Sequence, residues 1–191
     1  MQAISSRNQL FIGLGLAALM ALTRSHHFAG LHHLPEASWA VFFLAGVYLS
    51  RAWVFPALCL EAALVDYVAI AYGGTSGFCV TPAYAMLVPA YGALWLAGRW
   101  YAKHHRDAIA TLLPLAGSVL VGAMLAEAFS SGGFYLFSGY FTAPSLAEFA
   151  ARVARYFPAY LGAMALYVGV AALVHAAIAA RGRQASGNAV Q

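Results

Sequence analysis

Residues 108–130, AIATLLPLAGSVLVGAMLAEAFS, form a continuous apolar run in which Glu127 is the single ionisable side chain. The hydrocarbon core of a bilayer takes about 20 apolar residues of helix at about 1.5 Å per residue, so this run predicts a membrane-spanning helix. The whole chain agrees, because 63% of its 191 residues are hydrophobic and 8% are charged, against about 25% charged residues in soluble domains. The sequence therefore predicts an all-α polytopic membrane protein.

Further apolar segments repeat this pattern along the chain. The predicted spans are six transmembrane helices at 8–23, 38–50, 52–72, 82–100, 108–130 and 156–180. The second is short and meets the third at a tight turn at Ser50 and Arg51. We expect residues 1–181 to form a single membrane domain and the polar residues 182–191 to form a disordered cytoplasmic tail.

The distribution of Lys and Arg predicts the orientation of these spans. Of the ten such residues, three (Arg24, Arg152 and Arg155) fall on one side and seven on the side that holds both termini. This bias places both termini in the cytoplasm, N-in/C-in. The loops 24–37, 73–81 and 131–155 then face outward, and we expect the function to reside there. The net charge of +4 is spread between apolar runs, which excludes nucleic acid as a partner.

The outward loop GGTSGFCVT, residues 73–81, carries Cys79. Thr81 and Pro82 have the residue types of an N-cap and a first helical position, so Cys79 is predicted to lie near the positive end of the fourth helix. That position lowers the pKa of a thiol. The alternative is a small apolar residue in a buried loop, and that interpretation suits Cys59 in the third span better.

Asp66 lies in the outer third of the third span, where an ionisable group is energetically expensive. We expect it to face the bundle interior or a water-filled cavity. It is either a functional-site residue or a member of a structural ion pair or of a hydrogen bond to Tyr or Trp. Glu127, near the outer end of the fifth span, is a weaker candidate of the same kind.

The first outward loop, RSHHFAGLHHLPEA at 24–37, contains two histidine pairs, His26 with His27 and His32 with His33. Imidazole is a common ligand for zinc, copper, iron and nickel. An alternative function is therefore a small nickel or cobalt ion permease that uses these pairs. Adjacent histidines also occur as hydrated interfacial side chains, and no Cys or carboxylate set at fixed spacing accompanies them.

Residues 145–157 predict an amphipathic helix before the last span. Ser145 and Glu148 have the spacing of a capping box. Arg152 and Arg155 form either the solvated face of this helix or a pair of donors to a ligand. Pro158 is expected to kink the chain or to restart it as the last span.

The region around Cys79 resembles a known family. The stretch from Asp66 through GGTSGFCVTPAY to Tyr84, with SHHF at 25–28 and AARVARYF at 150–157, is similar to the BtuM-type vitamin B12 (cobalamin) transporters. These are S-components of the energy-coupling-factor (ECF) transporter class, whose six short helices enclose a ligand pocket closed by outward loops. The similarity covers nearly the whole chain, and its specific part is the loop that carries Cys79.

The resemblance implies binding and uptake of a corrinoid, cobalamin or cobinamide, across the bacterial inner membrane. The corrinoid is the transported ligand, and no cofactor of the protein's own is expected. The resemblance also implies that cobalt faces Cys79, since a coordinating thiol loses its proton outright. The other residues implied to line the pocket are His27, Asp66, Tyr84 and Arg152, with His26 as the alternative to His27.

A catalytic role follows as a hypothesis: with cyanocobalamin, the Cys79 thiolate would displace the upper cyanide and so decyanate the vitamin. Two other functions stay open. One is an intramembrane enzyme that uses Cys79, His27 and Asp66 as nucleophile, base and orienting group. The other is a scaffold subunit without a ligand.

The chain has no nucleotide-binding loop of the GxxxxGK[ST] type, so the energy for transport must come from elsewhere. Either an ECF-type coupling subunit and ATPases join through the first span, or the protein works alone. Gly13, Ala17 and Ala21 recur every four residues in that span. This pattern of small residues serves either a partner interface or internal helix packing.

Overall fold

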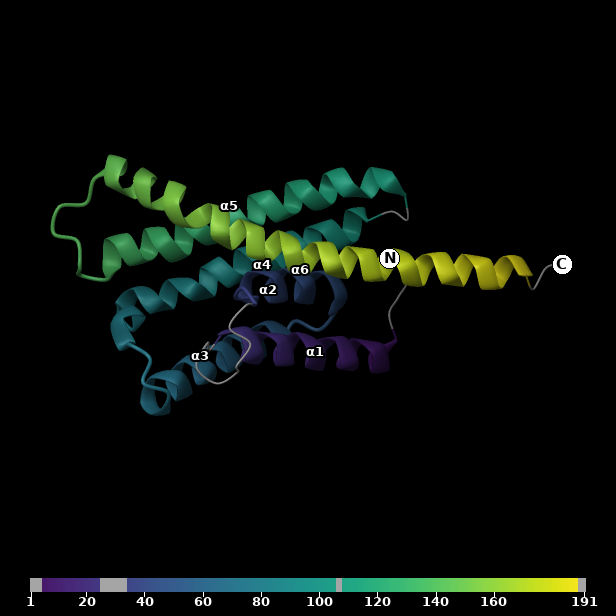
Figure 1. The fold of residues 1–191 in the computed structure, drawn as a ribbon, viewed down its shortest axis with the longest axis horizontal. Helices are drawn as coiled ribbons and strands as arrows, with labels where there is room; N and C mark the ends of the chain where they lie inside the picture. The colour runs from purple at the N-terminus through teal and green to yellow at the C-terminus, as the bar shows by residue number, and fades with distance from the viewer. Residues whose placement is uncertain (1–4, 25–33, 106–107, 189–191) are drawn as a thin grey trace.

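The computed structural model describes residues 5–24, 34–105 and 108–188, and all regular structure in these ranges is helical (Figure 1). The prediction of an all-α fold is confirmed, and each predicted apolar segment overlaps one α-helix. The α-helices are α1 Ser6–Arg24, α2 Ser38–Tyr48, α3 Val54–Tyr72, α4 Leu87–His104, α5 Leu112–Phe137 and α6 Leu146–Asn188. Three short 3-10 helices join them: η1 Gly77–Cys79, η2 Pro82–Met86 and η3 Ile109–Thr111.

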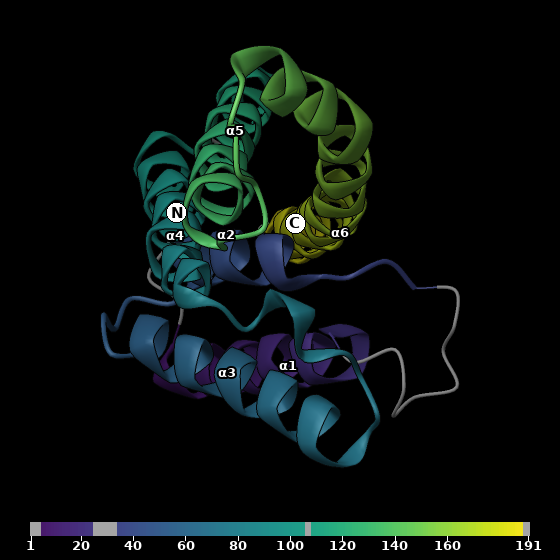
Figure 2. The same ribbon diagram turned by 90° about the vertical axis from the view of Figure 1, so that its left-hand side faces the viewer.

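The helices form a bundle with α2 at its centre. Figure 2 shows α1 and α3 side by side on one side of α2, with α4, α5 and α6 on the other. We call the end of the bundle where α1, α3 and α5 finish the distal end. The opposite end, where α2 and α4 finish, is the proximal end.

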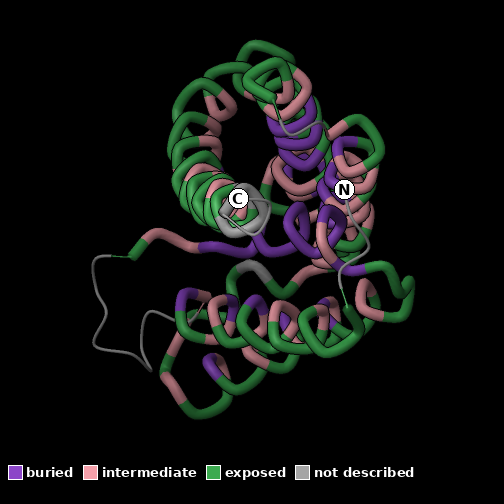
Figure 3. Tube along the Cα trace, turned by 90° about the vertical axis from the view of Figure 1, so that its right-hand side faces the viewer, coloured by how far each residue is buried: buried purple, intermediate pink, exposed green. Residues whose placement is uncertain are grey.

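The short helix α2 forms the core of the molecule. Every one of its residues from Ser38 to Val47 is buried (Figure 3). At about 1.5 Å per residue its 11 residues extend about 16 Å, well short of the roughly 30 Å of a bilayer core. Its apolar sequence is therefore explained by burial against the neighbouring helices rather than by contact with lipid.

Two glycines allow α2 and α4 to approach closely. A Cβ at Gly46 would overlap the carbonyl oxygen of Trp95, and a Cβ at Gly98 would overlap that of Phe43. Each glycine thus faces the backbone of the partner helix, Gly46 that of α4 and Gly98 that of α2. Small residues at such a contact let helices pack backbone against backbone, which gives close van der Waals contact.

Three helical segments of the described residues are long and apolar enough to cross a membrane: Val54–Tyr72, Ile109–Phe137 and Leu146–Gly182. These contain most of the third, fifth and sixth predicted spans. The structure therefore supports a membrane protein built on α3, α5 and α6, with α2 as an apolar helix enclosed by the others.

The C-terminal region differs from the sequence-based expectation. Instead of a separate amphipathic helix followed by a span, α6 is continuous from Leu146 to Asn188, with Pro158 inside it. The helix therefore does not restart at Pro158, and of the two expectations for this residue only a kink within a continuous helix stays a prediction. The helix also extends through residue 188 beyond the rest of the bundle, although a disordered tail was expected from residue 182 (Figure 1).

The small residues of α1 face the interior of the bundle. A Cβ at Gly13 would lie 3.7 Å from the Leu49 side chain, and Ala17 packs against the buried core. The pattern of small residues in the first span is thus used, at these two positions, for internal packing.

Candidate functional site

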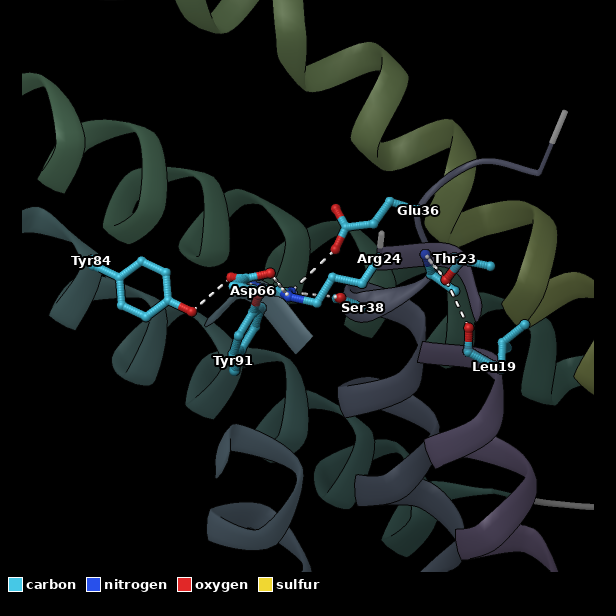
Figure 4. A network of polar contacts seen from close by, with 9 residues as sticks. Leu19, Thr23, Arg24, Glu36, Ser38, Asp66, Tyr84 and Tyr91 are labelled. Carbon is cyan, nitrogen blue, oxygen red and sulfur yellow. Dashed lines mark hydrogen bonds and ion pairs between the residues drawn. The ribbon is translucent and has the colours of Figure 1, made fainter. Parts of the chain in front are cut away.

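A cluster of polar side chains lies between the helices at the distal end, centred on Arg24, the last residue of α1 (Figure 4). We call it the Arg24 cluster; its other members are Glu36, Ser38, Asp66, Tyr84 and Tyr91. The backbone nearby is fixed by Thr23, whose hydroxyl accepts a hydrogen bond from Ala37 N–H at 3.1 Å. This bond holds the start of α2 against the end of α1.

Arg24 and Asp66 form a two-pronged ion pair. Nε of Arg24 donates to Oδ1 of Asp66, and Nη2 donates to Oδ2, both at 2.7 Å. The side chain of Arg24 is 8% exposed and that of Asp66 is 25% exposed, so water weakens the attraction little. Parallel hydrogen bonds between a guanidinium and a carboxylate are among the strongest charge-assisted pairs in proteins.

The remaining guanidinium nitrogen, Nη1 of Arg24, lies near three oxygen atoms of other elements. It donates to Tyr91 Oη at 2.7 Å, to Ser38 Oγ at 2.9 Å and to Glu36 Oε1 at 3.3 Å. Tyr91 is buried and stacks on Phe42 of α2, with ring centroids 4.1 Å apart. One cation thereby connects α1, the start of α2, α3 and α4.

Tyr84 joins the region after the Cys79 loop to the same cluster. Its hydroxyl donates to Oδ2 of Asp66 at 2.7 Å. Because Tyr84 belongs to η2 and Asp66 to α3, this bond ties together the two elements that flank residues 73–81. The predicted site residues Asp66 and Tyr84 therefore lie together, and Asp66 also belongs to the structural ion pair that the sequence left open.

The Cys79 loop has a defined backbone. Gly74 has a φ of 69°, in the left-handed region that glycine adopts without strain. Cys79 is the last residue of η1, and two residues later the hydroxyl of Thr81 accepts a hydrogen bond from Ala83 N–H, with Pro82 at the first helical position. The predicted N-cap is thus confirmed, although the helix that it opens is the 3-10 helix η2, which leads into α4.

Aromatic rings connect the Cys79 loop to the loop after α5. Phe78 stacks on Tyr140 with ring centroids 4.3 Å apart, and the Tyr140 hydroxyl donates to the Phe78 carbonyl oxygen at 3.3 Å. Phe134 lies against both Phe78 and Phe141. These contacts bring the segment next to Cys79 close to the start of α6.

Arg152, the predicted ligand donor of α6, lies against this aromatic group rather than in the Arg24 cluster. Its guanidinium carbon is 4.8 Å from the centre of the Phe141 ring and 5.8 Å from that of Tyr156. The predicted cap of α6 is also present, since Ser145 Oγ accepts a hydrogen bond from Glu148 N–H. The Glu148 carboxylate, however, accepts a hydrogen bond from Tyr135.

The histidine predictions fall on residues that the structure does not describe. His26, His27, His32 and His33 all lie in 25–33, outside the described residues. Within the described residues, no group of three or more His, Cys, Asp and Glu side chains is placed to hold a metal ion. The ion-permease and histidine-ligand interpretations therefore stay predictions.

Arg24 is the site residue that sequence reasoning missed. It was counted only as a positive charge of an outward loop, although it is the cation nearest to the end of the first span. The signal for Arg24 is Asp66, a solitary acid at a similar depth in another span. A solitary acid in a span requires a partner of opposite charge or a hydrogen-bond donor. Its second carboxylate contact, Glu36, precedes the buried start of α2.

Glu127 of α5 is a separate buried acid. It is 3% exposed, and Ser131, four residues further along the same helix, is the polar side chain near its carboxylate. It therefore does not belong to the Arg24 cluster. A buried ionisable group within a spanning helix stays a candidate for a functional role.

No protein-family model matches the chain, and no curated protein matches it. A fold alone does not define a function, so the chemistry of the site is the basis for the functional proposal.

Proposed function

We propose that this protein binds a corrinoid, cobalamin or cobinamide, at its distal end and takes it up across the inner membrane of a bacterium, with Cys79 as the cobalt ligand. The observation that carries the proposal is the anchoring of the Cys79 loop. Asp66 and Tyr84, on either side of this loop in the sequence, are joined by a hydrogen bond of 2.7 Å. The backbone of Cys79 is thereby held at the distal end of an apolar bundle.

The proposed orientation has both termini in the cytoplasm and six passages through the membrane, in which α2 and the residues on either side of it pass inside the bundle rather than through lipid. Its support is the distribution of Lys and Arg, seven on the side of the termini and three on the other. In this orientation the distal end faces outward, so the Cys79 loop meets the ligand before transport.

Cobalt ligation by Cys79 has a chemical basis. A thiol bound to a metal ion is deprotonated, and a thiolate is a soft ligand for a transition metal. Gly74 and its neighbours allow the loop backbone to approach a bulky ligand, because glycine has no side chain to obstruct it. Anchoring through Phe78 and Tyr140 on one side and Tyr84 on the other would hold the backbone of Cys79 in place beside the ligand.

The other proposed pocket residues would recognise the polar edge of the ligand. A corrin ring carries amide side chains, whose oxygen atoms would accept hydrogen bonds from Arg152. The Tyr84 hydroxyl donates its one proton to Asp66, so its oxygen would accept a hydrogen bond from an amide N–H of the ligand. His27 is proposed to contribute from the first outward loop. The role that we propose for Asp66 is indirect: it holds Tyr84 and Arg24 in place, since both of its oxygens already accept hydrogen bonds from them.

Decyanation would be a consequence of the same bond. When cyanocobalamin binds, the Cys79 thiolate would take the upper position of cobalt with its electron pair, and cyanide would leave with the electron pair of the broken cobalt–carbon bond. This exchange changes no oxidation state and requires no reductant. It is tested by measuring free cyanide after the purified protein is mixed with cyanocobalamin, with Cys79→Ala as the comparison.

The binding proposal is tested by calorimetric titration of the purified protein with cobinamide. We expect saturable binding by the unmodified protein and its loss in Cys79→Ala. Cys59→Ala is the matched control, because it removes the other cysteine of the chain, which lies in α3. Absence of binding by the unmodified protein, or equal binding by Cys79→Ala, would contradict the proposal.

A further inference from the structure

Glu127 of α5 is a buried acid that the proposed corrinoid site does not use. It is the one acid in the segment Ile109–Phe137, which is long and apolar enough to cross a membrane. Among the described residues it is also the one acid that is buried, since the others are all partly or fully exposed. Along α5, about 15 Å of helix separates it from the distal end at Phe137, taking 1.5 Å per residue.

The face of α5 that carries Glu127 changes character at this residue. Residues four apart share one face of a helix, which here holds Val119, Ala123, Glu127, Ser131 and Tyr135. On the proximal side of Glu127 this face is apolar, and Val119 and Ala123 belong to the buried core. On the distal side it is polar: Ser131 is half-buried, and the Tyr135 hydroxyl donates to the exposed Glu148 at 2.9 Å. Polar contact with Glu127 is therefore available from the distal end.

The surroundings of the Glu127 carboxyl group suit its protonated form. A carboxylate has about four lone-pair sites for hydrogen bonds, and the polar side chain near this one is the single hydroxyl of Ser131. In the part of the chain that the structure describes, no Lys, Arg or His lies within ion-pair distance of it. A buried charge without such partners is strongly disfavoured. A neutral carboxyl group, in contrast, can donate its proton to the Ser131 oxygen.

The ionisable side chains of η2 and α4 at this level have other partners. Gly122 packs against α4 and Gly133 packs against η2, so Glu127 lies level with the first half of α4. The ionisable residues of that stretch are Tyr84 and Tyr91, whose hydroxyls are bound in the Arg24 cluster at 2.7 Å. The short helix α2 adds no ionisable residue before its last residue, at the proximal end.

The cations of α6 nearest to this level also have other contacts. α6 passes α5 at Gly132, whose neighbour is Phe149. Beyond this point α6 carries Arg152, Arg155 and Tyr156, and the two guanidinium groups lie over aromatic rings, 4.8 Å and 5.5 Å from the ring centres. Within the described ranges, neither arginine forms an ion pair with an acid of α5.

We propose that Glu127 is a proton-binding site, whose carboxyl group holds a proton inside the bundle and exchanges it with the distal end through the Ser131 hydroxyl. In this exchange the Ser131 oxygen accepts the carboxyl proton and passes its own proton toward the distal end. The reverse transfer restores the acid. The inference is independent of corrinoid binding, because no residue of the proposed corrinoid pocket takes part.

The test of proton binding is infrared spectroscopy of the purified full chain in detergent at neutral pH. We expect the carbonyl band of a protonated carboxyl group in the unmodified protein and its loss in Glu127→Gln, which keeps the size of the side chain. Glu127→Asp keeps an acid and should keep a band at a shifted position. Glu36→Gln is the control, because this acid is paired with Arg24 and ionised, so its loss should leave the band unchanged. A spectrum of Glu127→Gln identical to that of the unmodified protein would overturn the proposal.

The route through Ser131 has its own comparison. Transfer to heavy water replaces the proton by deuterium and shifts the Glu127 band, so the rate of the shift measures access to the carboxyl group. Ser131→Val removes the hydroxyl and should slow the shift, whereas Ser131→Thr has nearly the same shape as valine, keeps the hydroxyl and should exchange as the unmodified protein does. Equal rates in the valine and threonine variants would refute the route.

Discussion

Asp66→Asn removes one carboxylate from the Arg24 cluster and keeps the size of the side chain. The guanidinium of Arg24, 8% exposed, then loses its two-pronged ionic partner, and Tyr84 loses a charged acceptor. Breaking a buried pair in this way costs about 3–5 kcal/mol, because the other charge is left without compensation. We therefore expect the variant to be less stable than the unmodified protein.

The structure narrows the expected loss in the free energy of unfolding. Asp66 is 25% exposed, and Glu36 still faces Arg24 at 3.3 Å, so solvent and the second carboxylate reduce the loss to about 3 kcal/mol. For a chain of this size, 1 kcal/mol corresponds to about 2–4 °C in the melting temperature. Asp66→Asn should therefore lower the melting temperature by roughly 6–12 °C.

The assay is thermal unfolding of the purified protein in detergent, followed by intrinsic fluorescence. Glu61→Gln is the matched control, because it neutralises a carboxylate of the same helix outside the Arg24 cluster. Replacing both Arg24 and Asp66 by Leu should recover much of the stability, since an apolar pair leaves no buried charge unpaired. A loss no larger than that of Glu61→Gln, or a double variant as unstable as the sum of the two single changes, would refute the reasoning.

Three further changes test the packing and the caps. Gly98→Ala should destabilise the protein by about 1–3 kcal/mol in the same melting assay, because the new methyl group overlaps the Phe43 backbone. Gly92→Ala is the control and should cost much less, because a Cβ there lies 3.7 Å from the Phe55 ring. Ser145→Ala should cost about 1 kcal/mol through loss of the α6 cap, and unchanged melting would argue against that cap. Tyr84→Phe should increase protease cleavage within residues 73–81 by releasing η2 from Asp66; equal cleavage rates would contradict the anchoring.

The sequence predicted the helices well because each one coincides with a long apolar run, and such a run is typical of a helix in a membrane protein. It predicted the role of α2 poorly, since an apolar helix enclosed by protein and one facing lipid have the same composition. Length was the available signal: the 11 residues of Ser38–Tyr48 extend about half the thickness of a bilayer core, which is too short for a helix that faces lipid. The continuity of α6 was left open, because Pro158 predicts either a kink or a restart of the helix and a single segment of sequence does not choose between the two.

The candidate site was predicted in part. The position of Asp66 in an apolar run showed its depth in the span and that burying its charge is energetically expensive. A buried charge of this kind requires a partner. The identity of that partner could not be predicted, because Arg24 is 42 residues away in the sequence. Sequence spacing gives the depth of a residue in its span but not which neighbouring helix the residue faces. Tyr91 and Ser38 were not predicted as members of the cluster for the same reason. They reach Arg24 only because α2 packs against α4.

The most direct test of the central claim is an absorption titration of the purified protein with hydroxocobalamin. Cobalt–thiolate bonding should shift the corrin bands to a new saturable spectrum in the unmodified protein and in Cys59→Ala, and Cys79→Ala should leave the spectrum of the free vitamin. A spectrum of the unmodified protein identical to that of free hydroxocobalamin, or the same shift in Cys79→Ala, would contradict the assignment of Cys79 as the cobalt ligand.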